Sequence, residues 1–168
     1  MSKVLPLIAF TFAFTSIASA QAAPPEMQDV AWLIGHWRGQ GWIDGDDGQR
    51  KTFTESERVE ARADGAALSI DGRGQSEGAV VHSAFGVVAY DKNARLFRWV
   101  AVESTGDQVV TEAAVSEQRL VWTLAAGPSL TMRYTITLDE RGRWFEIGER
   151  SSDGQHWQQF FEQTLERC

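Results

Sequence analysis

The stretch WLIGHWRGQGW, Trp32–Trp42, decides the fold of this chain. It holds three tryptophans and three glycines among eleven residues, with polar residues between them. Residues 27–34 carry apolar side chains at helical spacing, and after them apolar and polar residues alternate as in a strand. Gly39 and Gly41 fall in phase with Trp37, and glycine in a strand lets the backbone bend or another backbone approach closely. The stretch predicts a short helix followed by a tightly packed first strand.

The alternation continues through the rest of the chain. In LTMRYTITL, residues 130–138, every second residue is apolar, and QRLVWTLA, residues 118–125, repeats the pattern. Turn-forming sequences such as DGDDG, TGD and SDGQ separate such segments, which gives roughly ten strands joined mostly by hairpins. One open sheet of that size would leave long exposed edges. The sequence therefore predicts an all-β, up-and-down antiparallel barrel of about ten strands with a short N-terminal helix.

Residues 1–20 have the pattern of a secretory signal peptide. Lys3 supplies the positive charge, residues 4–17 are almost entirely apolar, and Ala18–Ala20 forms an A-x-A cleavage sequence. The apolar run is shorter than the ~20 residues that a membrane-spanning helix needs. We therefore expect cleavage near Ala20, a periplasmic or secreted protein, and no membrane span.

The remaining sequence divides into a Pro- and Ala-rich lead-in, residues 21–26, and a single barrel domain, residues 27–168. The net charge of −7 argues against binding to nucleic acid, whose phosphates would repel it. Cys168 is the one cysteine, so no disulfide can form within the chain. The sequence predicts no cofactor and does not determine the oligomeric state.

A resemblance follows from the two ends of this domain. Gly35, followed by His36 and Trp37, resembles the G-x-W signature of the calycin superfamily, which includes lipocalins and fatty-acid-binding proteins. The resemblance implies that Trp37 seals one end of the barrel and that an arginine of the last strand, here Arg167, lies across its face. Gly35, Trp37 and Arg167 are accordingly assigned to structure. A guanidinium stacked on an indole ring contributes about 0.5–2 kcal/mol.

The resemblance is most specific to a family of exported bacterial calycin-like barrels of unknown function. Three segments carry it: WLIGHWRGQG, residues 32–41; AYDKNARLFRWVAVESTG, residues 89–106; and SSDGQHWQQFFEQTLER, residues 151–167. A more distant resemblance is to nitrobindins, ten-stranded barrels that hold haem, and it implies a haem-ligating histidine on the last strand. The matching positions are Gln159 and Phe160, and neither side chain can replace an imidazole. The sequence therefore does not favour haem.

Three further motifs match chemical sites only partly. Gly74–Gly78 fits G-x-S-x-G, but the residues that follow read as a strand and not as the helix of a nucleophile elbow. The loop beginning at Asp44 lacks the ligand and the glycine that an EF-hand requires at its fifth and sixth positions. His36, His82 and His156 have no spacing typical of zinc ligands, so no metal site is predicted.

Several polar residues occur in phase with apolar ones. Glu55 and Glu57 alternate with Phe53 and Val59, and Glu103, His82 and Gln159 show the same relation to their own neighbours. If these side chains face inward, the interior is an aromatic cavity with a few polar groups, as in many small-ligand sites. If a bulge shifts the phase, Glu55 and Glu57 face water instead.

Three functions remain open from the sequence. The first is an exported barrel that binds a small apolar or amphipathic molecule. The second is an isomerase or hydrolase that uses an inward glutamate with His82. The third is a barrel packed with its own side chains that serves in interactions and holds no ligand. The residues expected to line the interior are Glu57, His82, Trp99, Glu103, Trp122, Met132, Tyr134 and Gln159.

Overall fold

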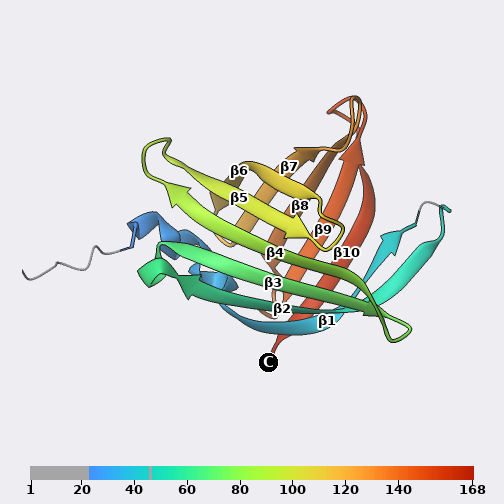
Figure 1. Cartoon of the computed structure of the whole chain (residues 1–168), viewed down its shortest axis with the longest axis horizontal. Helices are drawn as coiled ribbons and strands as arrows, with labels where there is room; N and C mark the ends of the chain where they lie inside the picture. The colour runs from blue at the N-terminus through green and yellow to red at the C-terminus, as the bar shows by residue number, and fades with distance from the viewer. Residues whose placement is uncertain (1–22, 46) are drawn as a thin grey trace, which may run out of the picture.

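Ten antiparallel strands close into a barrel in the computed structural model of the protein, which describes residues 23–45 and 47–168 (Figure 1). The strands are β1 Gly35–Asp44, β2 Arg50–Arg62, β3 Ala67–Ser76, β4 Ala79–Asp91, β5 Leu96–Glu103, β6 Gln108–Ser116, β7 Arg119–Ala125, β8 Thr131–Leu138, β9 Trp144–Ser151 and β10 Gln158–Arg167. Each strand pairs with its neighbours in the chain, and β1 closes onto β10. The predicted all-β antiparallel barrel is confirmed. The expected signal peptide, residues 1–20, lies outside the described residues.

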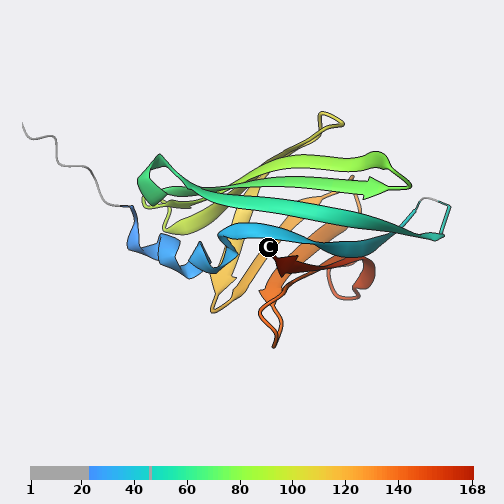
Figure 2. The same ribbon diagram turned by 90° about the horizontal axis from the view of Figure 1, so that it is seen from below.

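The connections between strands alternate between the two ends of the barrel. The β2–β3 and β4–β5 connections lie at one end (left in Figure 1), and the β1–β2 and β3–β4 hairpin tips lie at the other (right). Figure 2 shows that the N-terminal helical segment lies at the first of these ends. We call this end the closed end and the opposite one the rim.

A 3-10 helix, η1 (Pro25–Leu33), covers the closed end. Because a 3-10 helix has three residues per turn, Met27, Val30 and Leu33 share one face. All three are buried in the core, where η1 contacts β4 and β6. The α-helical spacing expected of this segment is replaced by a repeat of three, which leaves Ile34 38% exposed. Among the described residues, no helix has the length and apolar character needed to cross a membrane.

Trp37, on β1, forms the floor of the barrel interior. Its side chain is fully buried, and its Nε1 donates a hydrogen bond to the carbonyl oxygen of Leu33, 2.8 Å away. Its ring meets the ring of Trp144 edge to face, with the centroids 5.8 Å apart. The bond to Leu33 ties the end of η1 to the first strand, so helix and floor are held as one unit.

Arg167, near the end of β10, lies over Trp37 from the other side. Its guanidinium carbon is 4.0 Å from the centroid of the indole ring. Its Nη2 donates to the carbonyl oxygen of Trp32 at 2.9 Å, and its Nη1 donates to that of Ile34. Trp37 and Arg167 also face each other in the register of β1 with β10. The contact between these two residues that the sequence implied is therefore present.

Glycine allows β1 to lie very close to β10. A β-carbon at Gly39 would lie 2.8 Å from the Cα of Leu165 and would clash with the carbonyl oxygen of Thr164. Both of these are backbone atoms, which cannot move aside without breaking the pairing of the strands. Gly39 is thus required by close approach and not by an unusual backbone angle.

We predict that R167M lowers the free energy of unfolding by about 2 kcal/mol, because it removes the cation over Trp37 and two hydrogen bonds to backbone carbonyls. R38M, which alters an exposed arginine of the same β1–β10 region, is the control and should change stability by less than about 0.5 kcal/mol. Urea unfolding measures both variants. Equal stability of R167M and R38M would contradict the role given to the guanidinium.

We also predict that G39A destabilises the barrel by about 3 kcal/mol or more, because the added methyl group meets rigid backbone. G86A is the matched control: Gly86 is a buried strand glycine whose β-carbon would lie no closer than 3.5 Å to any neighbouring atom. G86A should shift stability by roughly 1 kcal/mol or less. The two midpoints of thermal unfolding, compared directly, test the tight contact at Gly39.

Candidate functional site

Three glutamates lie inside the barrel above the tryptophan floor. Glu55 and Glu57 are inward residues of β2, and Glu57 faces Trp37 in the β1–β2 register. Glu146 is an inward residue of β9, two positions after Trp144. Glu55 is 5% exposed and Glu146 is 7% exposed, so both carboxyl groups are removed from bulk water. We call these three residues the acidic cluster.

Glycines on both neighbouring strands make room for the carboxyl groups of β2. Gly74 and Gly72 of β3 face Glu55 and Glu57 in the register. A β-carbon at Gly74 would lie 2.6 Å from Oε2 of Glu55, and one at Gly72 would lie 2.8 Å from both carboxyl oxygens of Glu57. On the other side, Gly39 of β1 faces Glu55. The two side chains therefore occupy space that larger neighbours would fill.

The hydrogen bonding of the cluster is uneven. Oε2 of Glu146 accepts one bond from Nε1 of Trp144 at 3.0 Å and another from Nε2 of Gln163 at 2.7 Å. In contrast, Oε1 of Glu55 and Oε2 of Glu57 are buried and have no hydrogen-bond partner among the described residues. A buried acceptor without a partner costs about 1–3 kcal/mol, so these two oxygens are unusual features of a folded protein.

Burial changes the acidity of all three carboxyl groups. Loss of solvation raises the pKa of Glu146 to about 7, against the opposing effect of its bonds from Trp144 and Gln163. Loss of solvation also raises the pKa of Glu55 to about 7, against the opposing effect of backbone hydrogen bonds from Ser56 and Arg73 and with a smaller contribution from the charge of Glu146. The pKa of Glu57 is raised well above its usual value by burial and then by the charges of Glu55 and Glu146. Carboxyl groups of this kind can hold or exchange protons near neutral pH.

An aromatic row lies beside the cluster. The rings of Trp99 and Trp122 are stacked with centroids 4.1 Å apart, and Tyr134 continues the stack 5.3 Å from Trp122. In the β8–β9 register Tyr134 faces Gly148, one inward position above the pair of Ile136 with Glu146. Burial raises the pKa of Tyr134, with smaller contributions from the charges of Glu146 and Glu103.

The structure brings several of the expected lining residues together. Trp99, Trp122 and Tyr134 form the aromatic row, and the Tyr134 hydroxyl lies 4.0 Å from the sulfur of Met132. His82 is half-buried on β4 and faces Gly74, beyond which lies Glu55. Glu103 is the last residue of β5 and is exposed at the rim.

Gln159 does not share the inward face with Phe161, contrary to the alternation expected from the sequence. A bulge between Gln159 and Phe161 shifts the register of β10 with β9. Phe160 is consequently 5% exposed, and the amide of Gln159 donates to Oε2 of Glu162 at 2.9 Å. The phase argument failed here because one extra residue turns the preceding side chain to the other face of the strand.

The residues of β10 do not fit an axial haem ligand. Phe160 packs edge to face against Tyr134, and the amide of Gln159 is bonded to Glu162. His156 is exposed in the β9–β10 connection, where its Nδ1 lies 2.7 Å from Oδ2 of Asp153. In the described part of the chain, no three His, Cys, Asp or Glu side chains are arranged to hold a metal ion.

Sequence reasoning missed Glu146 and Gln163, although the signal was present. In WFEIGER, residues 144–150, Glu146 is in phase with buried Trp144, and in FFEQTLER Gln163 is in phase with Leu165. The same test that selected Glu57 would have selected both. Their pairing across β9 and β10 depends on the register, which the sequence does not supply.

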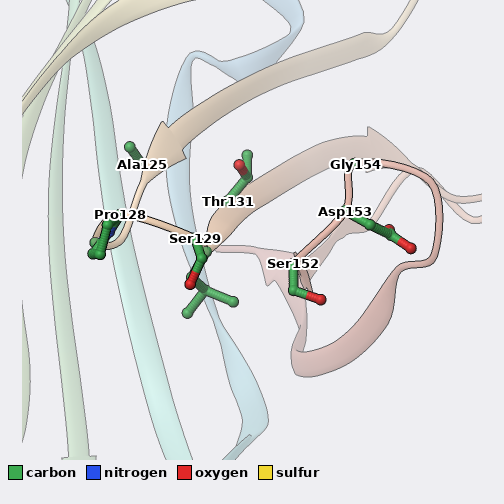
Figure 3. Close-up of a pocket in the computed structure, with 9 residues that line it drawn as sticks. Ala125, Pro128, Ser129, Thr131, Ser152, Asp153 and Gly154 are labelled. Atoms are coloured by element: carbon green, nitrogen blue, oxygen red, sulfur yellow. The ribbon is translucent and has the colours of Figure 1, made fainter.

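A depression of about 400 Å³ opens at the rim between two loops (Figure 3). Pro128, Ser129 and Thr131 line one side, from the β7–β8 connection and the start of β8, while Ser152 and Asp153 line the other. The depression lies at the end of the barrel opposite the tryptophan floor.

The G-x-S-x-G match, Gly74–Gly78, ends β3 and forms the tight turn before β4. Its serine is therefore not on a strand-to-helix elbow.

We predict that the free energy of unfolding decreases as the pH rises from about 4.5 to about 7. Folded Glu55 and Glu146 keep protons over this range that the unfolded chain has already released, so deprotonation favours unfolding. E146Q keeps an acceptor for Trp144 and Gln163 but removes the titration. At pH 8 it should be more stable than the wild type by up to roughly 3 kcal/mol.

Urea unfolding followed by tryptophan fluorescence at pH 5 and pH 8 measures this difference. E60Q is the control, because the bond from Arg62 lowers the pKa of outward Glu60 and keeps it ionised throughout the range. A pH slope in E146Q as steep as that of the wild type would show that Glu146 is not held in its neutral form.

Comparison with known proteins identifies a similar fold among solved structures. No protein-family model matches the chain, and no curated protein matches it. The crystal structure of Rv2717c from M. tuberculosis is similar, with a TM-score of 0.61 and 17% sequence identity over 87% of this chain and 99% of that chain. At this level of identity the similarity shows a shared ten-stranded barrel fold and nothing about function.

Proposed function

We propose that this protein binds a small amphipathic molecule in the interior of its barrel. The observation that carries the proposal is the position of unpartnered carboxyl oxygens, on Glu55 and Glu57, inside a barrel that also holds a row of aromatic rings. Small-ligand sites commonly combine apolar and aromatic walls with a few polar groups that fix orientation. The resemblance to calycins, whose members include ligand-holding barrels, supports the same conclusion.

In this proposal the two parts of the interior have different tasks. Trp99, Trp122 and Tyr134 contact the apolar body of the ligand, because stacked rings offer a large and rigid apolar surface. Glu55 and Glu57 contact its polar end. Trp37 and Arg167 close the floor below and take no part in contact with the ligand.

The proposal includes action outside the cytoplasm. The pattern of residues 1–20, with its positive charge, apolar run and A-x-A sequence, is typical of an exported protein. A barrel in that location would capture or carry a molecule from the periplasm or the medium.

A second candidate is an enzyme that transfers protons, such as an isomerase or a hydrolase. The favouring observation is that Oε2 of Glu55 and the Cβ of His82 lie 2.6 and 3.1 Å from the same point, the β-carbon position of Gly74. Burial also raises the pKa of Glu55 to about 7, a value suited to a general acid or base. In that case E55Q would bind the molecule and leave it unconverted, whereas a binding protein returns it unchanged in both forms.

We predict saturable quenching of tryptophan fluorescence by at least one member of a panel of fatty acids, retinoids, porphyrins and alkylamines. W122L should weaken that binding by roughly tenfold or more, because it removes the central ring of the row. W42L, which alters a tryptophan stacked under Arg50 on the outward side of β1, is the control and should leave the affinity unchanged.

Isothermal titration calorimetry of the same compounds checks that the quenching reports binding. Absence of a saturable response across the panel would contradict interior binding. Equal weakening in W42L and W122L would contradict the assignment of the site to the aromatic row.

A further inference from the structure

Two oxygens of the acidic cluster can accept hydrogen bonds that no described group donates. Glu55 is more than nine-tenths buried, and its Oε1 has no partner among the described side chains and backbone groups. Oε2 of Glu57, two residues further along β2, is also buried and also has no partner among the described groups. Glu146 differs, because Trp144 and Gln163 already supply it with donors. The unmet hydrogen-bonding capacity is therefore concentrated on two adjacent inward positions of one strand.

The electric field at this position favours a positive charge. The charges that act on Glu57 come from Glu55, Glu146 and Asp71, and all of them are acidic. The arginine of this strand that is nearest in sequence, Arg58, points outward and is paired with Asp71 at 2.9 Å. Arg150 of β9 also lies on the inward face, opposite Met132, with its guanidinium carbon 6.0 Å from the ring centroid of Phe160. Among the described residues no arginine contributes to the charges that act on Glu57, so a cation that reaches the cluster meets carboxyl groups there.

The neighbouring aromatic row suits the same kind of ligand. Aromatic faces attract ammonium and guanidinium groups as well as apolar surfaces. Tyr134 lies opposite Gly148, two residues from Glu146 on β9, so the end of the row and Glu146 occupy neighbouring inward positions. A molecule that holds its cationic end at the cluster would extend its body along Tyr134, Trp122 and Trp99.

The space around the carboxyl groups limits the size of the cationic end. On the β3 side, the carboxyl groups of Glu57 and Glu55 already fill the positions next to Gly72 and Gly74. On the floor side, Trp37 and Trp144 close the interior. The cationic end must therefore reach the cluster from the barrel axis, which a primary ammonium or an amidinium does more readily than a bulky quaternary group.

We infer that Glu55 and Glu57 form a receptor for a small N–H-donating cation, so that the ligand of this barrel is an amphipathic amine or amidine. The inference rests on the proposed function, because it specifies the ligand class of the same interior. A protonated amine supplies donors to both unpartnered oxygens and stabilises the ionised form of the carboxyl groups, whose pKa falls when the cation binds beside them. An anionic ligand such as a fatty acid would supply no donors to these oxygens and would bind only while the carboxyl groups stay neutral, so it is disfavoured.

The test compares three molecules that share one tail: octylamine, octanol and octanoate. Isothermal titration calorimetry of the full mature protein at pH 7 should show octylamine binding roughly tenfold or more tightly than octanol or octanoate. The double variant E55Q/E57Q keeps the shape of both side chains. In it, the affinity for octylamine should fall by a similar factor, to the level of octanol.

E60Q is the matched control, since it makes the same change at an outward position of β2 and should leave octylamine binding unchanged. Circular dichroism and thermal unfolding of each variant show whether the barrel remains folded, and the single variants E55Q and E57Q replace the double variant if it does not.

The possible failures separate the two proposals. Octanol or octanoate binding as tightly as octylamine would overturn the cation receptor and leave interior binding standing. No octylamine binding, with a different member of the fluorescence panel bound, would have the same meaning. No binding of any compound in either experiment would overturn the proposed function itself.

Discussion

The pairing of the first strand with the last is the constraint on which the rest of this structure depends. It joins β1 to β10 from Trp37 opposite Arg167 to Ile43 opposite Phe161, and it leaves the sheet without an edge. Gly39 permits the close approach of the two backbones, and Arg167 fixes the closed end by spanning from β10 to the residues before β1. Once the sheet is closed, every second side chain of each strand faces a shared interior.

That enforced interior gives the glutamates of β2 their unusual properties. On an open sheet, Glu55 and Glu57 could reach water, but in the closed barrel one face of β2 is sealed off. Burying a carboxyl group is unfavourable, and apolar residues of similar volume would stabilise the barrel better. The neighbouring glycines, Gly72 and Gly74, add a further cost in stability, because glycine weakens a strand. They also leave room for the carboxyl groups of Glu57 and Glu55. Places where a sequence departs from what stability favours are where function is to be sought.

The sequence was sufficient to predict the architecture because the evidence for it is periodic. Alternation and turn residues gave the number of strands, and the resemblance at Gly35–Trp37 and Arg167 gave the closure. The candidate site was predicted in part: Glu57, Trp99, Trp122 and Tyr134 were found through their phase. Gln159 was wrongly predicted to face inward, because a bulge reverses the inward–outward alternation of β10 and no residue type in the sequence indicates it. The effect of the charge of Glu146 on Glu55 and Glu57 could not be predicted at all, since it depends on how β9, β10, β1 and β2 come together around the closure.

The closure of β1 onto β10 also determines when this protein can fold. Residues 37 and 167 must meet, so the final pairing joins the two extremes of the domain. A nascent chain that has not yet released its last strand exposes the unpaired edges of both β1 and β9, each able to recruit another chain. Closure of the barrel must therefore wait until β10 is free to pair with β1. Until then, those two edges are the parts of the chain most open to pairing with another molecule.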